Sequence, residues 1–346
     1  MAGASLFDRV HRRIASARHQ RRFHAALEHL HGPERAETPE DAVIVVALVR
    51  DGMFYLDAFL RHYRALGAAQ FVFCDNGSTD GTVERLKREK DVVILRCDLP
   101  WGEIENTFRR YAAERYAKGR WCLFADMDEM FEFEGAAQIG LPGLTRYLQD
   151  HGHSALMAQM LEMFPEGPLS AAAKLSYEQA LETFCWYDLR AVERHGYHDP
   201  AIGFSWFLTG NRLANPKVEM LFGGLRKRVF GEQCCLSKHP LVRVVDGVEP
   251  GVHPHASAGV RVADFTALIR HYKFAGDTTA RDADTIRRNA IPHGEDRQRQ
   301  ARFEAEPDLS LWSDQAERFQ GFEPLYQAGF LIRSDAFTAY LEEART

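Results

Sequence analysis

Two aspartates separated by one residue, Asp126 and Asp128, are the side chains in this sequence best suited to bind a metal ion. They belong to the stretch DMDE, which directly follows the apolar run WCLFA. At the end of an extended strand, residues i and i+2 project to the same side, so both carboxylates can face one cation. Mn²⁺ or Mg²⁺ prefers oxygen ligands and commonly joins one or two carboxylates to substrate phosphates. The alternative for such a short motif is a solvated acidic loop, but its position after an apolar strand favours metal binding.

Two further polar pairs follow apolar runs that are predicted to be strands. Arg50 and Asp51 come directly after DAVIVVALV, and Asp75 and Asn76 come directly after QFVFC. The second pair opens the turn DNGSTDGT, whose serine, threonine and aspartate side chains are suited to cap the following helix. The carboxylate of Asp75 could also accept a hydrogen bond from a nucleobase N–H group. A capped turn and a nucleotide contact are therefore both expected here.

The segments between these polar groups alternate between two periodicities. DAVIVVALV is continuous and β-branched, which is typical of a strand covered on both faces, and MFYLDAFLRHYRALG has its apolar residues at helical spacing. The alternation continues through QFVFC, TVERLKREK, DVVILRC, WGEIENTFRRYAAERYAKG and WCLFA. It predicts an α/β, Rossmann-like fold with a mostly parallel central sheet flanked by helices. Ligands bind beyond the carboxyl ends of such strands, so the three polar groups are expected to converge on one crevice.

The pattern is less regular in the second half of the chain. ALMAQMLEMF and FCWYDLRAV are interpreted as strands or short core segments. GGLRKRVF, LSKHPLVRVV and GVHPHASAGV are interpreted as strands and loops, because glycine, proline and histidine are frequent in them. From about residue 276 the chain is charged and its pattern is helical, which predicts a helical C-terminal extension.

The composition narrows the classes of function. A net charge of −6 argues against broad nucleic-acid binding, and no run approaches the roughly 18 apolar residues that a membrane-spanning helix needs. The first residues lack the apolar core of a secretory signal, and the six cysteines form no CxxC pair. These features predict a cytoplasmic protein with buried thiols. The basic run at residues 9–24 is either a solvated helix or a peripheral contact with an anionic membrane.

Taken in order, several segments resemble a known family. VALVRDGMFYLDAFLRHYRALG, FVFCDNGSTDGT and WCLFADMDEMF are similar to the family 2 and family 92-like glycosyltransferases. The segments GGLRKRVF, LSKHPLVR and LIRHYKF add a closer likeness to a bacterial branch associated with lipopolysaccharide or capsule assembly. The resemblance covers residues 40–275 and implies a GT-A fold. It also implies metal-dependent transfer of a sugar from a nucleotide-sugar donor, such as a UDP-sugar, to a glycan or glycolipid acceptor, with inversion expected at the sugar carbon.

The resemblance also divides the chain and assigns some of its residues. It implies that Asp75 contacts the nucleobase, that Asp126 contacts the ribose or the metal, and that Asp128 binds the metal. The predicted regions are a basic helical leader (1–40), a catalytic domain with a nucleotide-binding half and an acceptor half (41–135 and 136–275), and a helical C-terminal region (276–346).

A late histidine often completes the metal site in families of this fold. The candidates are His253, His255 and His271, of which His255 and His271 are favoured because each follows a strand-like segment. The cations that could reach the donor diphosphate or an anionic acceptor are Lys238, Arg226 and Arg228. Ordinary packing or surface roles remain the alternative for each of these side chains.

The general base that an inverting enzyme needs is less clearly marked. Asp188, Glu162 and Glu232 are the available carboxylates in the second half, and Asp188 is favoured because it ends an aromatic run. The alternative for Asp188 is an ion pair with Arg190 or Arg194. Aromatic side chains that could stack on a sugar, or simply form core, are Trp186, Tyr187, Phe204, Trp206 and Phe207.

Two other functions compete with glycosyl transfer. A nucleotidyltransferase also combines an α/β sheet with acidic metal ligands, but it usually has an early glycine-rich basic loop, which VALVRDGMFYLD does not resemble. A non-catalytic glycan-binding protein could retain the fold, although the presence of Asp75, Asp126 and Asp128 together argues against loss of activity.

Overall fold

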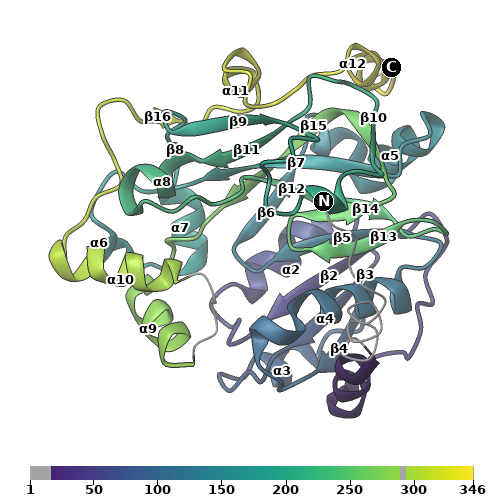
Figure 1. The fold of residues 1–346 in the computed structure, drawn as a ribbon, viewed down its shortest axis with the longest axis horizontal. Helices are drawn as coiled ribbons and strands as arrows, with labels where there is room; N and C mark the ends of the chain where they lie inside the picture. Colours follow the sequence, from purple (N-terminus) through teal and green to yellow (C-terminus); the bar gives the residue numbers. More distant parts are fainter. Residues whose placement is uncertain (1–16, 289–293, 346) are drawn as a thin grey trace, which may run out of the picture.

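A computed structural model describes residues 17–288 and 294–345, and it is built around one large mixed sheet (Figure 1). In the described residues this sheet has ten strands in the order β1-β4-β3-β2-β5-β12-β7-β15-β10, with β6 paired to β15 beside this path. Their bounds, in that order, are Glu28–His31, Val92–Arg96, Gln70–Asp75, Val43–Val49, Trp121–Asp126, Ser237–Arg243, Ala155–Glu162, Arg261–His271, Arg212–Leu213 and, for β6, Glu129–Glu132.

Most strands of this sheet run in one direction. The pairs β4-β3, β3-β2, β2-β5, β7-β15 and β15-β10 are parallel, whereas β1, β12 and β6 run antiparallel to their neighbours. Because β12 lies antiparallel between β5 and β7, these last two strands still point the same way. The prediction of an α/β fold with a mostly parallel central sheet is confirmed, and this arrangement fits a GT-A fold.

Helices cover both faces of the N-terminal part of the sheet. Successive residues of β2 alternate between two core clusters, and all seven are buried. One cluster contains the apolar faces of α2 (Leu56–Ala65), α3 (Thr82–Leu86) and α5 (Ala136–Asp150), and the other contains that of α4 (Trp101–Tyr116). Burial on both faces explains why this strand is apolar throughout rather than alternating in polarity.

The described part of the predicted leader is folded onto this layer. Residues 17–26 are helical, and Phe23 is 0 % exposed in the core cluster that contains α4. Its ring lies 5.5 Å from that of Phe108, measured between centroids. Arg22 donates to Glu103 at 2.6 Å, and β1 then pairs with β4 at the edge of the sheet. The first half of the basic run, up to residue 16, lies outside the described residues.

Short elements surround the second half of the sheet. Two-stranded sheets join β9 to β11, β13 to β14 and β8 to β16; these six strands span Val192–Gly196, Glu219–Gly223, Glu249–His253, Ala256–Ala258, Trp186–Tyr187 and Glu317–Arg318. The helices of this region are α6 (Leu169–Ala172), α7 (Tyr177–Thr183), the 3₁₀ helix η1 (Ser205–Phe207) and α8 (Gly224–Phe230). The interpretation of GGLRKRVF as strand or loop was wrong: Gly223 ends β11 with a positive φ of 78°, and the rest forms α8.

The C-terminal region is mostly helical, and α12 packs against the large sheet. Helices α9 (Thr278–Arg288) and α10 (Glu295–Ala305) lie together at one side of the molecule, and α11 (Glu323–Gln327) and α12 (Asp335–Glu343) lie at its upper edge (Figure 1). Phe337 of α12 stacks on Phe265 of β15 at 4.1 Å between ring centroids. None of the helices in the described ranges combines the length and the apolar character needed to cross a bilayer.

Candidate active site

The strand order brings the predicted acidic cluster together with residues from distant parts of the chain. Asp126 ends β5, a tight turn contains Asp128, and β6 begins at Glu129. Strand β15 lies between β6 and β7, so His271 is opposite Glu129 on one side and opposite Glu162 on the other. Four acidic residues therefore surround the end of β15, although Glu162 and His271 are 109 residues apart in sequence.

Asp126 is held by two cations. Lys238, on the neighbouring strand β12, donates to its carboxylate at 2.8 Å and also to that of Glu129. Arg109 of α4 lies 3.5 Å from the other oxygen of Asp126. Burial alone would raise the pKa of Asp126, but the charges of Lys238 and then Arg109 outweigh it and hold that pKa below its ordinary value. Lys238, which was predicted to bind the diphosphate, therefore already pairs with two protein carboxylates.

Asp128 faces the histidine that the sequence favoured as a metal ligand. The Nε2 atom of His271 lies 3.4 Å from the Asp128 carboxylate, and its Nδ1 atom lies 3.0 Å from Glu162. Burial opposes protonation of the imidazole, but Glu162 and then Asp128 raise the pKa of His271 to about 9. An imidazole whose two nitrogen atoms each face a carboxylate has a fixed ring orientation.

The Asp128–His271 pair fits a divalent cation in part. A carboxylate oxygen and an imidazole nitrogen are both metal ligands, and Glu162 would orient the ring from its far side. The described ranges contain no group of three or more His, Cys, Asp or Glu side chains arranged to hold a metal ion. Oxygen atoms of a substrate or of water would have to complete such a site.

A chain of buried ions leads from His271 to the C-terminal helices. Arg226 of α8 lies 2.8 Å from Glu162 and 3.4 Å from Glu232. Glu232 also pairs with Arg299 of α10 at 2.8 Å, and Arg299 pairs with Asp282 of α9 at 2.7 Å. Each of these side chains is at most 8 % exposed. The predicted ligand-binding residue Arg226 is thus already engaged by two protein carboxylates.

The predicted nucleotide-binding residues lie where expected but have local partners. In the parallel register, Val49 is opposite Asp75 and Leu48 is opposite Asp126, so the three strand ends are neighbours. The Asp75 side chain is 0 % exposed and accepts from the backbone N–H groups of Gly77 and Ser78 at 3.1 Å. These bonds stabilise the turn itself. The predicted capping of the next helix is found only in part, because its N-cap is Gly81, without a side-chain cap, and Asp80 accepts from the backbone N–H of Thr82 at 3.0 Å. The contact of Asp75 with a nucleobase stays a prediction.

The residues beside Asp75 stabilise the same two loops. Asn76 is buried and donates to the carbonyl oxygens of Cys97 at 2.7 Å and Leu99 at 2.9 Å. Arg50 donates to the carbonyl oxygen of Asn76 at 2.5 Å. Asp51 has a positive φ of 52° and accepts from the backbone of Thr79 at 2.6 Å. These contacts connect the loop after β2 to the loop after β3.

The other predicted metal ligand, His255, is placed differently. Its Nδ1 atom lies 2.9 Å from the carbonyl oxygen of Ser237, and its ring stacks beside Phe204. Burial, followed by the charge of Lys238, lowers the pKa of His255 well below its ordinary value. Its ring is therefore neutral, and it lies in the electric field of Lys238. Within residues 17–288 and 294–345 it makes no contact with Asp126 or Asp128.

The favoured general base, Asp188, lies in an ion cluster. Its carboxylate pairs with Arg190 at 2.6 Å and with Arg228 at 3.0 Å. Burial would raise the pKa of Asp188, but these arginines hold it below its ordinary value. A carboxylate that is stabilised in this way is a weak base, so the contacts favour the ion-pair alternative. Glu162 and Glu232 also have arginine partners.

Two residues near Asp128 were not identified from the sequence. Lys273 follows His271 by two positions, and its charge acts on the Asp128 carboxylate. Arg281, at the start of α9, also acts on Asp128 and donates to the hydroxyl group of Tyr55. Lys273 lies in the turn that follows β15, so strand periodicity gave no signal for it.

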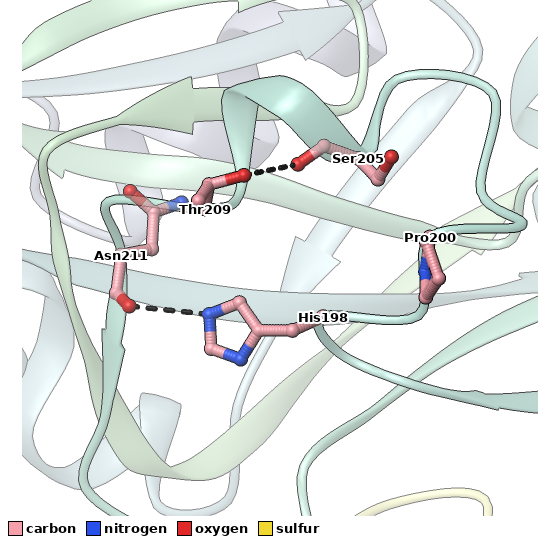
Figure 2. Close-up of a pocket in the computed structure, with 5 residues that line it drawn as sticks. All are labelled: His198, Pro200, Ser205, Thr209 and Asn211. Atoms are coloured by element: carbon pink, nitrogen blue, oxygen red, sulfur yellow. Dashed lines mark hydrogen bonds between the residues drawn. The ribbon is translucent and has the colours of Figure 1, made fainter. Parts of the chain in front are cut away.

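A separate pocket lies beside η1. It has a volume of about 350 Å³ and is lined by His198, Pro200, Ser205, Thr209 and Asn211 (Figure 2). The hydroxyl group of Thr209 donates to the carbonyl oxygen of Ser205 at 3.2 Å (Figure 2). The Nε2 atom of His198 lies 3.2 Å from the backbone carbonyl oxygen of Asn211 (Figure 2). Trp206 of η1 is 66 % exposed, so this member of the predicted aromatic cluster presents its ring to solvent.

Comparisons with known proteins add little to this description. No family model and no curated protein matches the chain. Among solved structures, it is similar to a crystal structure of S. aureus TarS, with 19 % identity, a TM-score of 0.29, and coverage of 37 % of this chain and 40 % of that one. It is also similar to UDP-glucose pyrophosphorylase complexed with UDP-glucose, with 10 % identity, a TM-score of 0.21, and coverage of 44 % and 66 %. Sequence identities and TM-scores at these levels do not indicate a function.

Proposed function

We propose that the protein is a metal-dependent glycosyltransferase that moves a sugar from a nucleotide-sugar donor, such as a UDP-sugar, to a glycan or glycolipid acceptor. The observation that carries this proposal is the arrangement of Asp128, His271 and Glu162 at the carboxyl end of a mostly parallel sheet. Ligand sites of α/β sheets lie at this end of the strands. The order of motifs that resembles family 2 and family 92-like glycosyltransferases supports the same function.

The reaction would exchange one bond at the sugar carbon for another. The acceptor hydroxyl oxygen would form a bond to the anomeric carbon while its proton passes to a general base. The bond from that carbon to the phosphate oxygen would break, and its electron pair would leave with the diphosphate. Asp128 and His271 are the residues that would hold Mn²⁺ or Mg²⁺, and such an ion would supply positive charge to offset that of the leaving group. The ion pairs of Asp126 with Lys238 and Arg109 would hold the rim of the site in place.

Metal and nucleotide should therefore stabilise the protein together. With only two protein ligands in contact, the metal is expected to bind weakly until diphosphate oxygens complete its coordination. We expect UDP plus Mn²⁺ to raise the melting temperature by several degrees, and UDP with EDTA, or Mn²⁺ alone, to raise it much less. Thermal melts over UDP, GDP and ADP, each with Mn²⁺ or EDTA, measure both dependences.

The same melts can contradict the proposal. Equal stabilisation by UDP in Mn²⁺ and in EDTA would remove the metal from the mechanism. No stabilisation by any nucleoside diphosphate in the presence of Mn²⁺ would remove the nucleotide-sugar donor. A screen of nucleotide sugars for Mn²⁺-dependent release of nucleoside diphosphate then tests turnover itself.

A further inference from the structure

A strip of aromatic rings leads from η1, beside the pocket of Figure 2, toward the candidate active site. Between ring centroids, Trp206 lies 5.3 Å from Phe207, and Phe207 lies 6.3 Å from His253. His253 stacks on Phe204 at 4.2 Å with 20° between the ring planes, and Phe204 lies 6.2 Å from His255. These five side chains, called the aromatic strip below, join η1 to the loop between β13 and β14.

The inner end of the aromatic strip contacts strand β12 next to Lys238. The Nδ1 atom of His255 lies 2.9 Å from the carbonyl oxygen of Ser237, and the following residue, Lys238, donates to Asp126 at 2.8 Å. Because a carbonyl oxygen only accepts, Nδ1 carries the hydrogen, and Nε2 of the neutral ring is an acceptor. Among the described residues this Nε2 atom has no hydrogen-bond partner, so it can accept from a ligand.

At the outer end, the pocket is shaped by a buried polar network. Asn211 is 4 % exposed, and its side-chain amide donates to the hydroxyl group of Tyr197 and the carbonyl oxygen of Ser257, both at 2.9 Å. Its side-chain oxygen accepts from the backbone N–H of Val260 at 3.0 Å. All the polar atoms of this side chain therefore hold the backbone that contacts His198, and the pocket is formed in advance of any ligand.

The lining of the pocket is polar but contains no aspartate, glutamate, lysine or arginine. Figure 2 shows Ser205 and Thr209 across the pocket from His198. Thr209 donates its hydroxyl hydrogen to the carbonyl oxygen of Ser205, so its oxygen remains an acceptor. The Ser205 hydroxyl group has no hydrogen-bond partner within the described ranges. Such groups suit a ligand that carries hydroxyl groups, whereas a phosphate or carboxylate would find no lysine or arginine to pair with.

Trp206 lies on the same face of its turn as Thr209. Residues i and i+3 of a 3₁₀ helix lie above one another, and the turn continues because the backbone N–H of Leu208 donates to the carbonyl oxygen of Ser205 at 2.9 Å. Trp206 is 66 % exposed, whereas its neighbours Phe204 and Leu208 are buried. Buried neighbours on both sides therefore hold an exposed indole ring beside a polar pocket.

A pyranose ring combines C–H groups on its faces with hydroxyl groups at its edge, so an indole ring and nearby hydrogen-bonding groups suit it together. The pocket volume of about 350 Å³ lies within the usual range for small-molecule sites. We infer that the pocket and the aromatic strip bind an uncharged oligosaccharide, with one sugar ring on Trp206 and the chain directed toward Asp126. This inference rests on the proposed function in one respect, because the bound oligosaccharide would be the acceptor of that reaction.

The test measures oligosaccharide binding by the full chain without nucleotide or metal. A glycan array with short neutral oligosaccharides of hexoses and N-acetylhexosamines, and with sialylated and uronate-containing ones, selects the probe. Calorimetric titration with the best neutral oligosaccharide then compares wild type with Trp206→Ala and Thr209→Phe. We expect at least about tenfold weaker binding in Trp206→Ala, because an aromatic contact is lost, and a similar loss in Thr209→Phe, because its ring occupies the pocket. Both positions are exposed, so both variants should fold.

Trp312→Ala is the matched control, because Trp312 is also a partly exposed tryptophan, at 37 %, and does not line the pocket. It should bind the oligosaccharide as wild type does. Absence of neutral oligosaccharides among those that wild type binds would overturn the inference. Equal affinity of wild type and either pocket variant would overturn it as well.

The proposed function and this inference can fail separately. Transfer from a nucleotide sugar with a KM for the acceptor that neither Trp206→Ala nor Thr209→Phe raises would refute the oligosaccharide site and leave the glycosyltransferase function. Binding of a neutral oligosaccharide that depends on Trp206, in a protein that accepts no nucleotide sugar, would refute the glycosyltransferase function and leave the oligosaccharide site.

Discussion

At the scale of single residues, Asp128 contacts His271 in the structure and is proposed to bind a metal ion in the reaction. In the structure it faces the imidazole of His271, and this charge holds the pKa of Asp128 far below its ordinary value. In the proposed reaction the same carboxylate contributes to metal binding. A histidine that releases its proton when a cation binds would serve both states, because a ligating nitrogen must be unprotonated. Glu162 would keep the ring in place during this exchange.

Asp128→Asn separates metal binding from folding. The change keeps the size of the side chain but removes its charge, so we expect transfer to fall at least about 100-fold, because each 1.36 kcal/mol of lost stabilisation of the transition state is tenfold in rate. Stability should fall modestly, because His271 loses one of its two carboxylate partners. Turnover is measured per folded molecule at saturating donor and Mn²⁺, together with the melting temperature.

Asp246→Asn is the control for this variant. Asp246 is exposed and lies in a turn that is distant in sequence from Asp126 and Asp128. It should leave transfer and stability unchanged. An Asp128→Asn protein that is folded and transfers at nearly the wild-type rate would contradict the metal-binding role of Asp128.

Single residues also show where the sequence was informative. The apolar run before DMDE was enough to place Asp126 at a strand end, because strand periodicity is local. Asp128, however, lies in the turn after that strand and not on its extended end. The contacts of Arg226 were not accessible in this way. Its partner Glu162 lies on β7, 64 residues earlier in the chain, and the pairing of β7 with β12, the strand that follows α8, brings the two regions together. The sequence alone does not distinguish an arginine that pairs with buried carboxylates of the protein from one that binds a ligand.

At the scale of elements, the helix of residues 17–26 and strand β1 are parts of the folded domain. The sequence pattern of this region is basic and weakly periodic, which led to its prediction as a leader. Phe23, however, packs against α4 in a core cluster, and β1 covers the outer edge of β4. One aromatic residue in a polar stretch is a weak signal in sequence, but it buries a large area.

Phe23→Ala tests whether this helix contributes to stability. A fully buried phenylalanine that is reduced to alanine leaves a cavity, so we expect the free energy of unfolding to fall by about 3–5 kcal/mol. Arg18→Ala, an exposed substitution on the same helix, should change it by less than about 0.5 kcal/mol. Urea unfolding followed by circular dichroism measures both, and equal effects of the two variants would show that the helix does not pack in solution as described.

At the scale of the whole molecule, buried neutral histidines make the stability depend on pH. His239 of β12 is 4 % exposed, and burial lowers its pKa from 6.5 to about 4. Its Nδ1 atom accepts from the backbone of Ser257 at 3.2 Å, and its other nitrogen lies 3.0 Å from the hydroxyl oxygen of Tyr197. The two bonds are made together only by the neutral ring, in which Nδ1 accepts and the N–H group of Nε2 donates to Tyr197, because a protonated Nδ1 cannot accept.

The sign of this dependence follows from proton binding. Between pH 6.5 and about 4 the unfolded chain binds a proton at His239 that the folded chain does not bind, so stability falls as the pH is lowered through this range. We expect a loss of up to about 3 kcal/mol from this residue, with His255 adding to it. Urea unfolding from pH 7 to pH 4 measures the slope, which should become shallower in His239→Gln. An unchanged slope would assign the acid sensitivity to other groups.

The place of β12 in the sheet has a consequence for synthesis of the chain. Strand β12 separates β5 from β7, so the free edge of β5 finds its partner only after the 110 residues between Asp126 and Ser237 have been added. At about 5–20 residues per second, this takes roughly 5–20 s on the ribosome. During that time an apolar strand edge at the centre of the future sheet has no partner, and such edges readily pair with other chains. The nascent protein is therefore most vulnerable to aggregation before β12 emerges, and a chaperone that binds the growing chain in this interval would increase its yield.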